Sequence, residues 1–448
     1  MNRRHFIYST AMTSLGFVSL SRCTSNWGEK AQSASVGEGQ LEIVPDPKQY
    51  LDLPKGFEYR IISRSGNKMS DGLFVPGRPD GMGAFLNEQG QCVLVRNHEN
   101  SPGSLKHSAF GENDEFLGDV DMGLLYDAGR GKVPALGGTT TVIYDEKTGE
   151  VIEEYLSLAG TTRNCAGGVT PWNSWLTCEE SVTKADEETV EKDHGYVFDV
   201  PAFNKGLADP KPIVGMGRFN HEAVAVDPET HIVYQTEDRP DGLIYRFVPT
   251  DKTDLHQGGQ LEVLAIKGKK SLDTRNWEGK TVNLNEPMEV AWMPIDDVES
   301  PEDDLRFRGY HKGAARFARG EGMWMGDQEV YFACTNGGPK NFGQIFKYDI
   351  QDNTLELFAE SEDKTVLNMC DNLTVAPNGM LFVCEDNSDL NRIHYINKEG
   401  EVKQFAINRS SDSELAGAVF SPSGKTLFVN IQVNGDTVAI TGPWENLV

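Results

Sequence analysis

The sequence has few basic residues and no long apolar run beyond its N-terminus. Lys and Arg number 42 against 68 Asp and Glu, which gives a formal net charge of −26 at pH 7. Phosphate backbones require a basic surface, so we expect no nucleic-acid partner. A membrane-spanning helix needs about eighteen consecutive apolar residues, and the body of the chain contains no such run, so we expect no transmembrane helix there. Long amphipathic patterns are also lacking, while 46 glycines among 448 residues indicate many tight turns.

Cysteine is scarce too. No pair among the seven cysteines has the spacing of a metal finger, which argues against that kind of site. In an oxidising compartment disulfides are the default, but the sequence does not assign any pairing. The cysteines are Cys23, Cys92, Cys165, Cys178, Cys334, Cys370 and Cys384.

The first residues have the pattern of an export signal. Arg3 and Arg4 precede a weakly apolar stretch over 6–20, as in a twin-arginine signal. We therefore interpret residues 1–28 as a signal peptide and expect a periplasmic or extracellular protein. The tetrapeptide ending at Cys23 loosely resembles a lipoprotein cleavage box, which leaves a lipid anchor at Cys23 as an open alternative.

A repeat is hidden by loops of unequal length. Each copy has an apolar lead-in, a turn with Pro, Asn, Asp or Gly, and a strand with a polar end, which is the chemistry of short hairpins. The six copies are LNEQGQCVLVRNHEN (86–100), VTPWNSWLTCEE (169–180), VDPETHIVYQTED (226–238), MGDQEVYFACTN (325–336), VAPNGMLFVCEDN (375–387) and FSPSGKTLFVNIQ (420–432).

After five of these copies a further aromatic strand follows, with no convincing helix between. This pattern predicts an all-β fold, a six-bladed β-propeller over residues 45–448. Loops at about 100–135 and 250–312 are expected as insertions that cap one face. A two-sheet sandwich is the alternative, but six similar units favour a radial array.

Equivalent positions of a propeller form a ring around its axis, so the repeat predicts a site. Six residues before the aligned turns lie Cys165, Glu222, Glu321, Asp371 and Ala416. The strands end in further acids, Glu99, Glu179, Glu237 and Glu385. Because acids that face one channel repel one another, we expect bound cations. Carboxylates favour calcium, and the Cys178 thiolate would favour iron or zinc.

Arginines lie near these acids. Arg319 comes two residues before Glu321, and Arg163, Arg218 and Arg392 occupy comparable loops. A guanidinium beside metal ions suits an oxyanion such as phosphate.

Several motifs together resemble the PhoX-type secreted alkaline phosphatases. They are RNHEN, GGTTTVIYD, GGVTPWNSWLTCEES, GRFNHEAVAVDP, VYQTEDRPDGLIYRF, ARGEG with FACTNGG, and CDNLTVAPNG, spread in order over about residues 50–440. The resemblance implies export by the twin-arginine route, a six-bladed propeller, and a cofactor of an iron pair with calcium ions.

Site roles follow from the same resemblance. Cys178 would be the iron thiolate ligand, Arg319 would neutralise the phosphoryl group, and Arg392 is the nearest candidate for a second arginine. The remaining metal ligands would be Glu99, Glu179, Glu222, Glu321 and Asp371, with Asn97, Glu237 and Asp386 as further candidates.

The sequence thus predicts a metal-dependent phosphomonoesterase that acts as a monomer on a small phosphomonoester. Two alternatives stay open on the same architecture. One is a calcium-dependent lactonase or esterase, and the other is a non-catalytic binding module stabilised by calcium.

Overall fold

Short strands joined by turns dominate the structure, a computed structural model that describes residues 41–104 and 107–447. The predicted all-β class is confirmed. Within the described residues one α-helix occurs, α1 (Leu305–Lys312). The short 3-10 helices are η2 (Leu117–Asp119), η3 (Met122–Leu124), η4 (Gly129–Gly131), η5 (Val214–Met216), η6 (Leu255–Gln257) and η7 (Trp444–Asn446).

Three of the five sheets are small and antiparallel. The first contains β4 (Pro79–Leu86), β5 (Cys92–His98), β6 (Gly137–Asp145) and β7 (Glu150–Thr161), in that order. The second contains β8 (Asn164–Val169), β9 (Ser174–Glu179) and β10 (Val197–Pro201). The third contains β24 (Leu415–Phe420), β25 (Thr426–Ile431), β26 (Asp436–Thr441) and β3 (Glu58–Arg64).

The other two sheets are larger. A nine-stranded sheet runs from β11 (His221–Val226) through β12 (Val233–Glu237), β13 (Ile244–Pro249), β14 (Gly259–Ile266), β15 (Met288–Pro294), β19 (Thr354–Glu360), β18 (Gln344–Asp349) and β17 (Glu329–Cys334) to β16 (Gly320–Met325). A six-stranded sheet runs from β20 (Cys370–Val375) through β21 (Leu381–Glu385), β22 (Arg392–Ile396), β23 (Val402–Asn408) and β2 (Leu51–Pro54) to β1 (Ile43–Val44).

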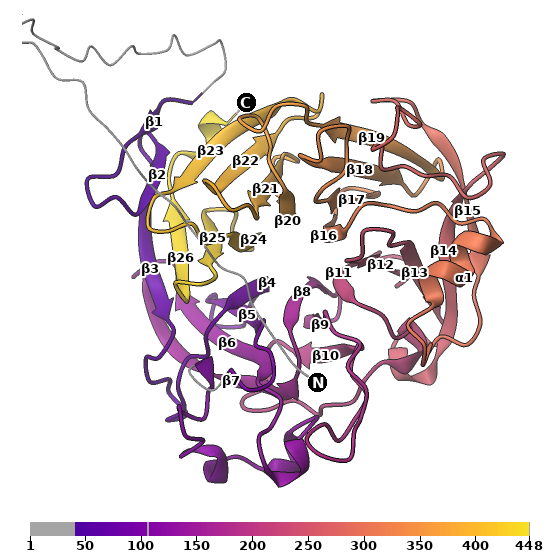
Figure 1. The fold of residues 1–448 in the computed structure, drawn as a ribbon. Helices are drawn as coiled ribbons and strands as arrows, with labels where there is room; N and C mark the ends of the chain where they lie inside the picture. Colours follow the sequence, from indigo (N-terminus) through magenta and orange to yellow (C-terminus); the bar gives the residue numbers. More distant parts are fainter. Residues whose placement is uncertain (1–40, 105–106, 448) are drawn as a thin grey trace, which may run out of the picture. The chain divides into compact units, whose positions relative to one another are not determined.

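The sheets are arranged radially, like the blades of a propeller. Their innermost strands β4, β8, β11, β16, β20 and β24 contact one another in that order, and β24 returns to β4 (Figure 1). Each innermost strand begins a unit, the set of paired strands that follows it in the sheet, and successive strands of a unit lie progressively farther from the centre (Figure 1). The innermost strands therefore surround a common axis.

Apolar side chains between neighbouring sheets hold this arrangement together. Strands β5, β9, β11 and β25 are buried over their full length, because another sheet packs on each of their faces. In one apolar cluster the rings of Phe317, Phe332 and Phe346 pack together, with centroids 5.3–5.4 Å apart. Each fully buried aromatic ring of this kind contributes about 1.5–3 kcal/mol.

The third and the last strands of the described chain pair in one sheet. Strand β3 pairs antiparallel with β26, from Arg64 opposite Asp436 to Glu58 opposite Thr441. Arg64 Nε also contacts Asp436 Oδ1 at 2.7 Å. An early strand therefore completes the last sheet of the ring.

Residues 250–312, which the sequence suggested as an insertion, contribute β14, β15 and α1. Strand β14 pairs with β13, and β15 links β14 to β19, so this segment joins two sets of strands into the nine-stranded sheet. Residues 100–135 contain η2–η4, and no strand is found among their described members.

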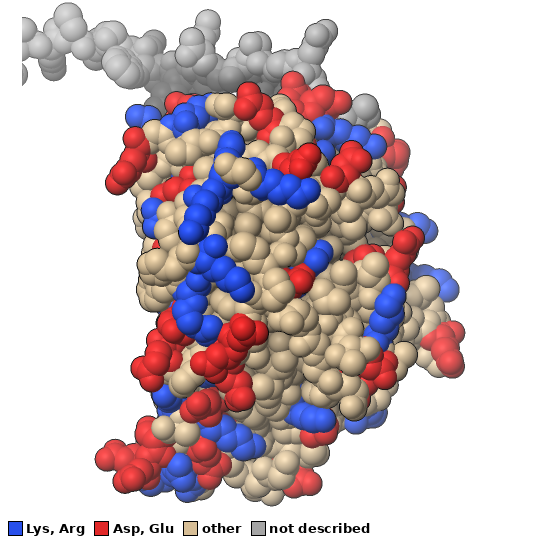
Figure 2. Space-filling model, turned by 90° about the vertical axis from the view of Figure 1, so that its right-hand side faces the viewer, with Lys and Arg blue, Asp and Glu red and all other residues tan. Residues whose placement is uncertain are grey.

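The surface over β14, β15 and α1 carries charges of both signs. Lys and Arg side chains there form a band that adjoins Asp and Glu side chains (Figure 2). Among the described residues no helix is long and apolar enough to cross a membrane. The predicted signal over 1–28 and the anchor at Cys23 lie outside the described residues.

Candidate metal centre

A cavity of about 210 Å³ lies among the innermost strands. Its lining comes from three equivalent positions, each repeated once per innermost strand. The fourteen lining residues are Arg78, Asp80, Glu99, Arg163, Cys165, Glu180, Glu222, Asp238, Arg319, Glu321, Asp371, Asp386, Glu414 and Gln432. The residues that line the cavity thus occupy equivalent positions of the sequence repeat.

The first position is the second residue of each innermost strand. In every one of these strands the pairing register with the next strand shifts at this point. Such irregularities break the simple alternation of side chains and re-aim individual residues. They account for the way the side chains point to the axis. The six residues are Asp80, Cys165, Glu222, Glu321, Asp371 and Ala416, and all but Ala416 line the cavity.

The second position directly follows the second strand of each unit. It holds Glu99, Glu180, Asp238, Thr335, Asp386 and Gln432, and all but Thr335 line the cavity. The third position directly precedes each innermost strand and holds Arg78, Arg163, Asn220, Arg319, Met369 and Glu414. In every unit the second-position N–H donates to the third-position carbonyl, at 2.9–3.4 Å. At each innermost strand, one backbone hydrogen bond thus holds the second-position and third-position residues next to each other.

The cavity is strongly acidic. Nine carboxyl groups and three guanidinium groups line it, which leaves six formal negative charges. Burial and the neighbouring Glu180, Asp371 and Asp80 raise the pKa of Glu222 well above its usual range. Burial is also the main cause that raises the pKa of Asp371 to about 6 and that of Glu180 to about 7. A cation in the cavity would reverse this penalty on the ionised forms.

The donor atoms converge as metal ligands do. Three groups each have one donor atom per residue within 4.8 Å of the others: Cys165 with Glu180 and Glu222, Glu222 with Glu321 and Asp371, and Asp80 with Glu99 and Glu414. Glu222 belongs to two of them, so it can bridge two ions. One thiol among many carboxylates provides for both a softer transition metal and hard cations. The residues present therefore fit a mixed metal cluster.

Arg319 is held in a fixed orientation beside these acids. Its Nε and Nη2 donate to both oxygens of Asp238 at 2.9 and 3.0 Å, and Nη2 also donates to Glu321 at 2.7 Å. These contacts leave Nη1 without a hydrogen-bond partner among the described residues, so two of its N–H groups can meet an anion.

Six of the predicted site residues lie in the cavity. They are Glu99, Glu222, Glu321, Asp371, Asp386 and Arg319. Eight further residues that line it were not among the predicted ligands and catalytic arginines, although the sequence did place Arg163 in a loop comparable to that of Arg319: Arg78, Asp80, Arg163, Cys165, Glu180, Asp238, Glu414 and Gln432. The alignment of turns did contain a signal for Cys165, because it put this thiol at the same offset as Glu222 and Glu321.

The thiol at the cavity is that of Cys165, whereas Cys178 lies elsewhere. Cys178 is fully buried in an apolar cluster with Leu176, Val197 and Phe219. The physical reason is its place along the strand. Cys178 lies inside β9, where its side chain packs between neighbouring sheets, whereas Glu180 lies after the strand end, at the level of the cavity. The six described cysteines are all free thiols.

Glu179 and Glu237 end their strands one residue too early to face the cavity. Both are fully buried and accept hydrogen bonds from the start of the third strand. Glu179 accepts from the N–H groups of Gly195 and Tyr196 at 2.8 and 3.2 Å. Glu237 accepts from the Leu243 N–H at 3.1 Å and the Tyr245 hydroxyl at 2.8 Å.

Asn97 and Arg392 also lie outside the cavity lining. Asn97 Nδ2 donates to the carbonyl groups of Cys165 and Ala166 at 3.1 and 2.8 Å, so it supports the strand that carries the cavity thiol. Arg392 Nη1 donates to Glu385 at 3.3 Å. Glu385 ends β21 as Glu179 ends β9, so Arg392 neutralises a strand-end glutamate.

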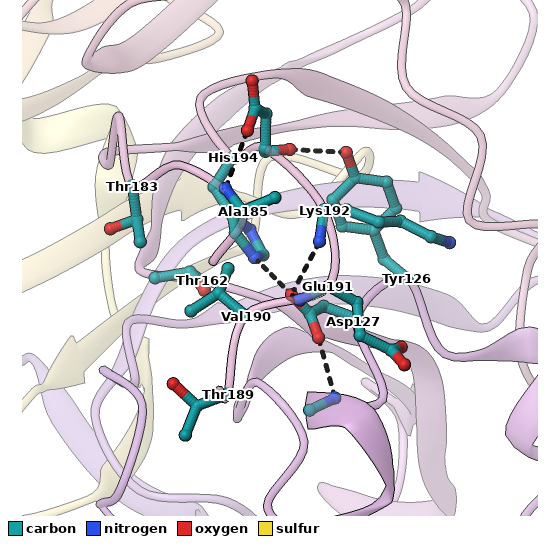
Figure 3. A network of polar contacts seen from close by, with 12 residues as sticks. Tyr126, Asp127, Thr162, Thr183, Ala185, Thr189, Val190, Glu191, Lys192 and His194 are labelled. Atoms are coloured by element: carbon teal, nitrogen blue, oxygen red, sulfur yellow. Dashed lines mark hydrogen bonds and ion pairs between the residues drawn. The ribbon is translucent and has the colours of Figure 1, made fainter. Parts of the chain in front are cut away.

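Behind Glu179 lies a buried histidine. His194 Nδ1 is 2.6 Å from Glu179 Oε1. Its Nε2 is 3.2 Å from Asp127 Oδ2 (Figure 3). Burial opposes the charged imidazolium, but these two carboxylates outweigh it and raise the pKa of His194 to about 9. Asp127 in turn accepts from the N–H groups of Glu191 and Lys192. This network ties two surface loops to the end of β9.

Comparisons with known proteins give one family. The sequence model of the family described as "Alkaline phosphatase PhoX" matches residues 39–435. No curated protein matches the chain significantly. Solved structures that resemble it include a gluconolactonase from Xanthomonas campestris, with 12% identity over 90% of this chain and 98% of that one, at a TM-score of 0.40. Another is the virginiamycin B lyase from Staphylococcus aureus, with 9% identity over 86% of this chain and 99% of that one, at a TM-score of 0.38.

Proposed function

The chain belongs to the PhoX alkaline phosphatase family, a family of phosphoric monoester hydrolases, and we propose that it hydrolyses phosphomonoesters at a mixed iron and calcium cluster in the central cavity. One observation carries the details: nine carboxyl groups, one thiol and three guanidinium groups converge on a single cavity. The carboxylates and the thiol suit cations, and the guanidinium groups suit the oxyanion that those cations attract.

The donor groups suggest which residues hold which ion. Cys165 with Glu180 and Glu222 would hold iron, because a thiolate favours transition metals. Glu222, Glu321 and Asp371 would together hold a second ion. Asp80, Glu99 and Glu414 offer oxygen donors alone, which suit calcium. When bound, such ions polarise phosphoryl oxygens and lower the pKa of water.

Arg319 would bind the phosphoryl group. Asp238 and Glu321 hold its guanidinium at a fixed angle, so little side-chain entropy is lost when an anion docks on Nη1. The same group would offset charge that develops on the phosphoryl oxygens during hydrolysis.

The architecture suits six blades. The closed ring of six innermost strands supports this number. The nine-stranded sheet would then comprise two blades, β11–β14 and β16–β19, joined through β15. We also propose export to the periplasm or beyond, by the signal that residues 1–28 resemble. A monomeric state, the absence of a nucleic-acid partner and a lipid anchor at Cys23 stay predictions.

The proposal is tested on protein exported by its own signal. Elemental analysis should find iron and calcium together, and p-nitrophenyl phosphate should be hydrolysed. Removal of the ions with a chelator should abolish hydrolysis, and readdition of both ions should restore it. Calcium alone with hydrolysis of a lactone would favour the lactonase alternative. Calcium alone without any hydrolysis would favour the binding module.

A further inference from the structure

Three arginines occupy one repeated backbone position. Arg78, Arg163 and Arg319 each directly precede an innermost strand, and their φ angles are 48°, 49° and 49°. Left-handed backbone is uncommon for residues other than glycine and carries a cost, so it persists where the surrounding structure imposes it. Four of the six residues at this position, the three arginines and Met369, adopt it, and the three guanidinium groups line one cavity.

Two of these arginines are neighbours. Arg78 Nη2 contacts Glu99 Oε2 at 3.1 Å, and Arg163 Nη2 contacts Glu99 Oε1 at 2.7 Å. Arg163 also pairs with Glu180 and donates from Nε to its carbonyl. These contacts leave Nε and Nη1 of Arg78 and Nη1 of Arg163 without partners among the described residues. The pair therefore presents several free donors on one side of the cavity.

This side differs from that of Arg319 in charge and in depth. Arg319 faces two carboxylates alone, whereas Arg78 and Arg163 together balance the two carboxylates that they contact. The side chains of Arg78 and Arg163 are 39% and 37% exposed, against 26% for Arg319. Strand β4, which follows Arg78, is three places from β16, which follows Arg319, in the ring of six. The pair is thus nearer the rim and on another side of the cavity.

We propose that Arg78 and Arg163 form a second anion subsite, which selects phosphomonoesters that carry a further carboxylate or phosphoryl group close to the ester. The subsite rests on the proposed function, in which Arg319 and the metal ions take the reacting phosphoryl group. A second anion at the rim would meet the free donors of Arg78 and Arg163, and charge-assisted hydrogen bonds of this kind are among the stronger hydrogen bonds in proteins.

Two phosphonates that resist hydrolysis test the subsite. Methylphosphonate carries the phosphoryl-like group alone, and phosphonoacetate adds a carboxylate one carbon away. Isothermal titration of the metal-loaded wild-type protein should give about tenfold tighter binding of phosphonoacetate. In Arg78→Gln that ratio should fall to about one to threefold. In Arg78→Lys the ratio should lie between those of Arg78→Gln and wild type, because lysine keeps the charge but lacks the planar set of guanidinium donors.

Arg409→Gln is the matched control. Arg409 is 42% exposed and pairs with buried Asp52 at 2.7 Å, much as Arg78 pairs with Glu99, but it does not line the cavity. This variant should keep the wild-type ratio. Equal binding of the two phosphonates by wild type, or an equal loss of both in Arg78→Gln, would overturn the subsite and leave the proposed function standing. Failure of wild type to bind either phosphonate would contradict the proposed function itself.

Discussion

Glu179 and Glu180 are adjacent in sequence but serve opposite sides of the chain at the end of β9. Glu180 lines the central cavity beside Arg163. Glu179 is fully buried behind it. Its carboxylate accepts hydrogen bonds from the backbone N–H groups of Thr162, Gly195 and Tyr196, and His194 Nδ1 lies 2.6 Å from it. We propose Glu180 as a cation ligand, whereas Glu179 holds the loops behind the cavity in place.

Substitution should separate these two roles. Glu180→Gln removes a candidate ligand, so we expect the metal content at limiting metal, or the phosphomonoesterase activity, to fall by more than about tenfold. The melting temperature of the chelated protein should hardly change. Glu179→Gln should lower that melting temperature, because it leaves Asp127 as the one carboxylate that contacts buried His194. The free energy of unfolding should fall by roughly 3 kcal/mol. Elemental analysis and calorimetry of both variants make the check, and identical behaviour of the two would contradict the assignment.

The two cysteines near β9 make a second pair. Cys165→Ser should lower the iron content by more than about tenfold, because the thiol at the cavity is lost. Cys178→Ser should keep the iron but destabilise the protein by about 1–3 kcal/mol, because a hydroxyl replaces a thiol among apolar side chains. Loss of iron in Cys178→Ser alone would return the ligand role to the residue that the sequence first suggested.

Arg319 and Arg392 were both predicted to be catalytic, and only Arg319 lines the cavity. Arg319→Gln should lower kcat/KM for p-nitrophenyl phosphate by about two orders of magnitude, the usual effect of losing one donor to a developing oxyanion. Arg392→Gln should keep kcat/KM within roughly twofold and lower the melting temperature, since Glu385 loses an ion pair. Steady-state kinetics decide, and a larger kinetic loss in Arg392→Gln would sink this distinction.

His194 should make stability depend on pH. Asp127 and Glu179 raise its folded-state pKa to about 9 against burial, from an ordinary 6.5, and the ring of Tyr126 packs on it edge-on. A raised pKa stabilises fully below the unfolded value, and the contribution is lost as pH rises through the folded one. The difference in free energy of unfolding between wild type and His194→Gln should therefore be largest near pH 6, at most about 3 kcal/mol, and shrink between pH 6.5 and 9. A gap that is constant over this range would show that the imidazole is neutral.

The repeat located the second residue of five innermost strands, because these five strands have the same length. From β8 onward each such strand has six residues, so a count back from the turn reaches Cys165, Glu222, Glu321 and Asp371. Strand β4 has eight residues, and the same count misses Asp80. A fixed offset in sequence finds only units of equal length.

The strand ends were harder to predict, because neighbouring residues there are chemically alike. The sequence offers Glu179 beside Glu180 and Glu237 beside Asp238, and either member could face the axis. Only the pairing of each strand decides, since a shift by one residue turns a side chain to the other face. Charge and spacing alone do not contain that information.

The pairing of β3 with β26 sets an order of events in time. Arg64 and Asp436, which meet there, are 372 positions apart, so this sheet depends on one of the longest-range contacts in the chain. Contacts between distant residues form slowly. On a ribosome, the strand that follows Gln432 emerges long after Asp80, so Glu414 and Gln432 reach their places beside Asp80 only after the other five innermost strands have been made. The proposed cation site at Asp80, Glu99 and Glu414 can therefore form only after this late part of the chain has been made.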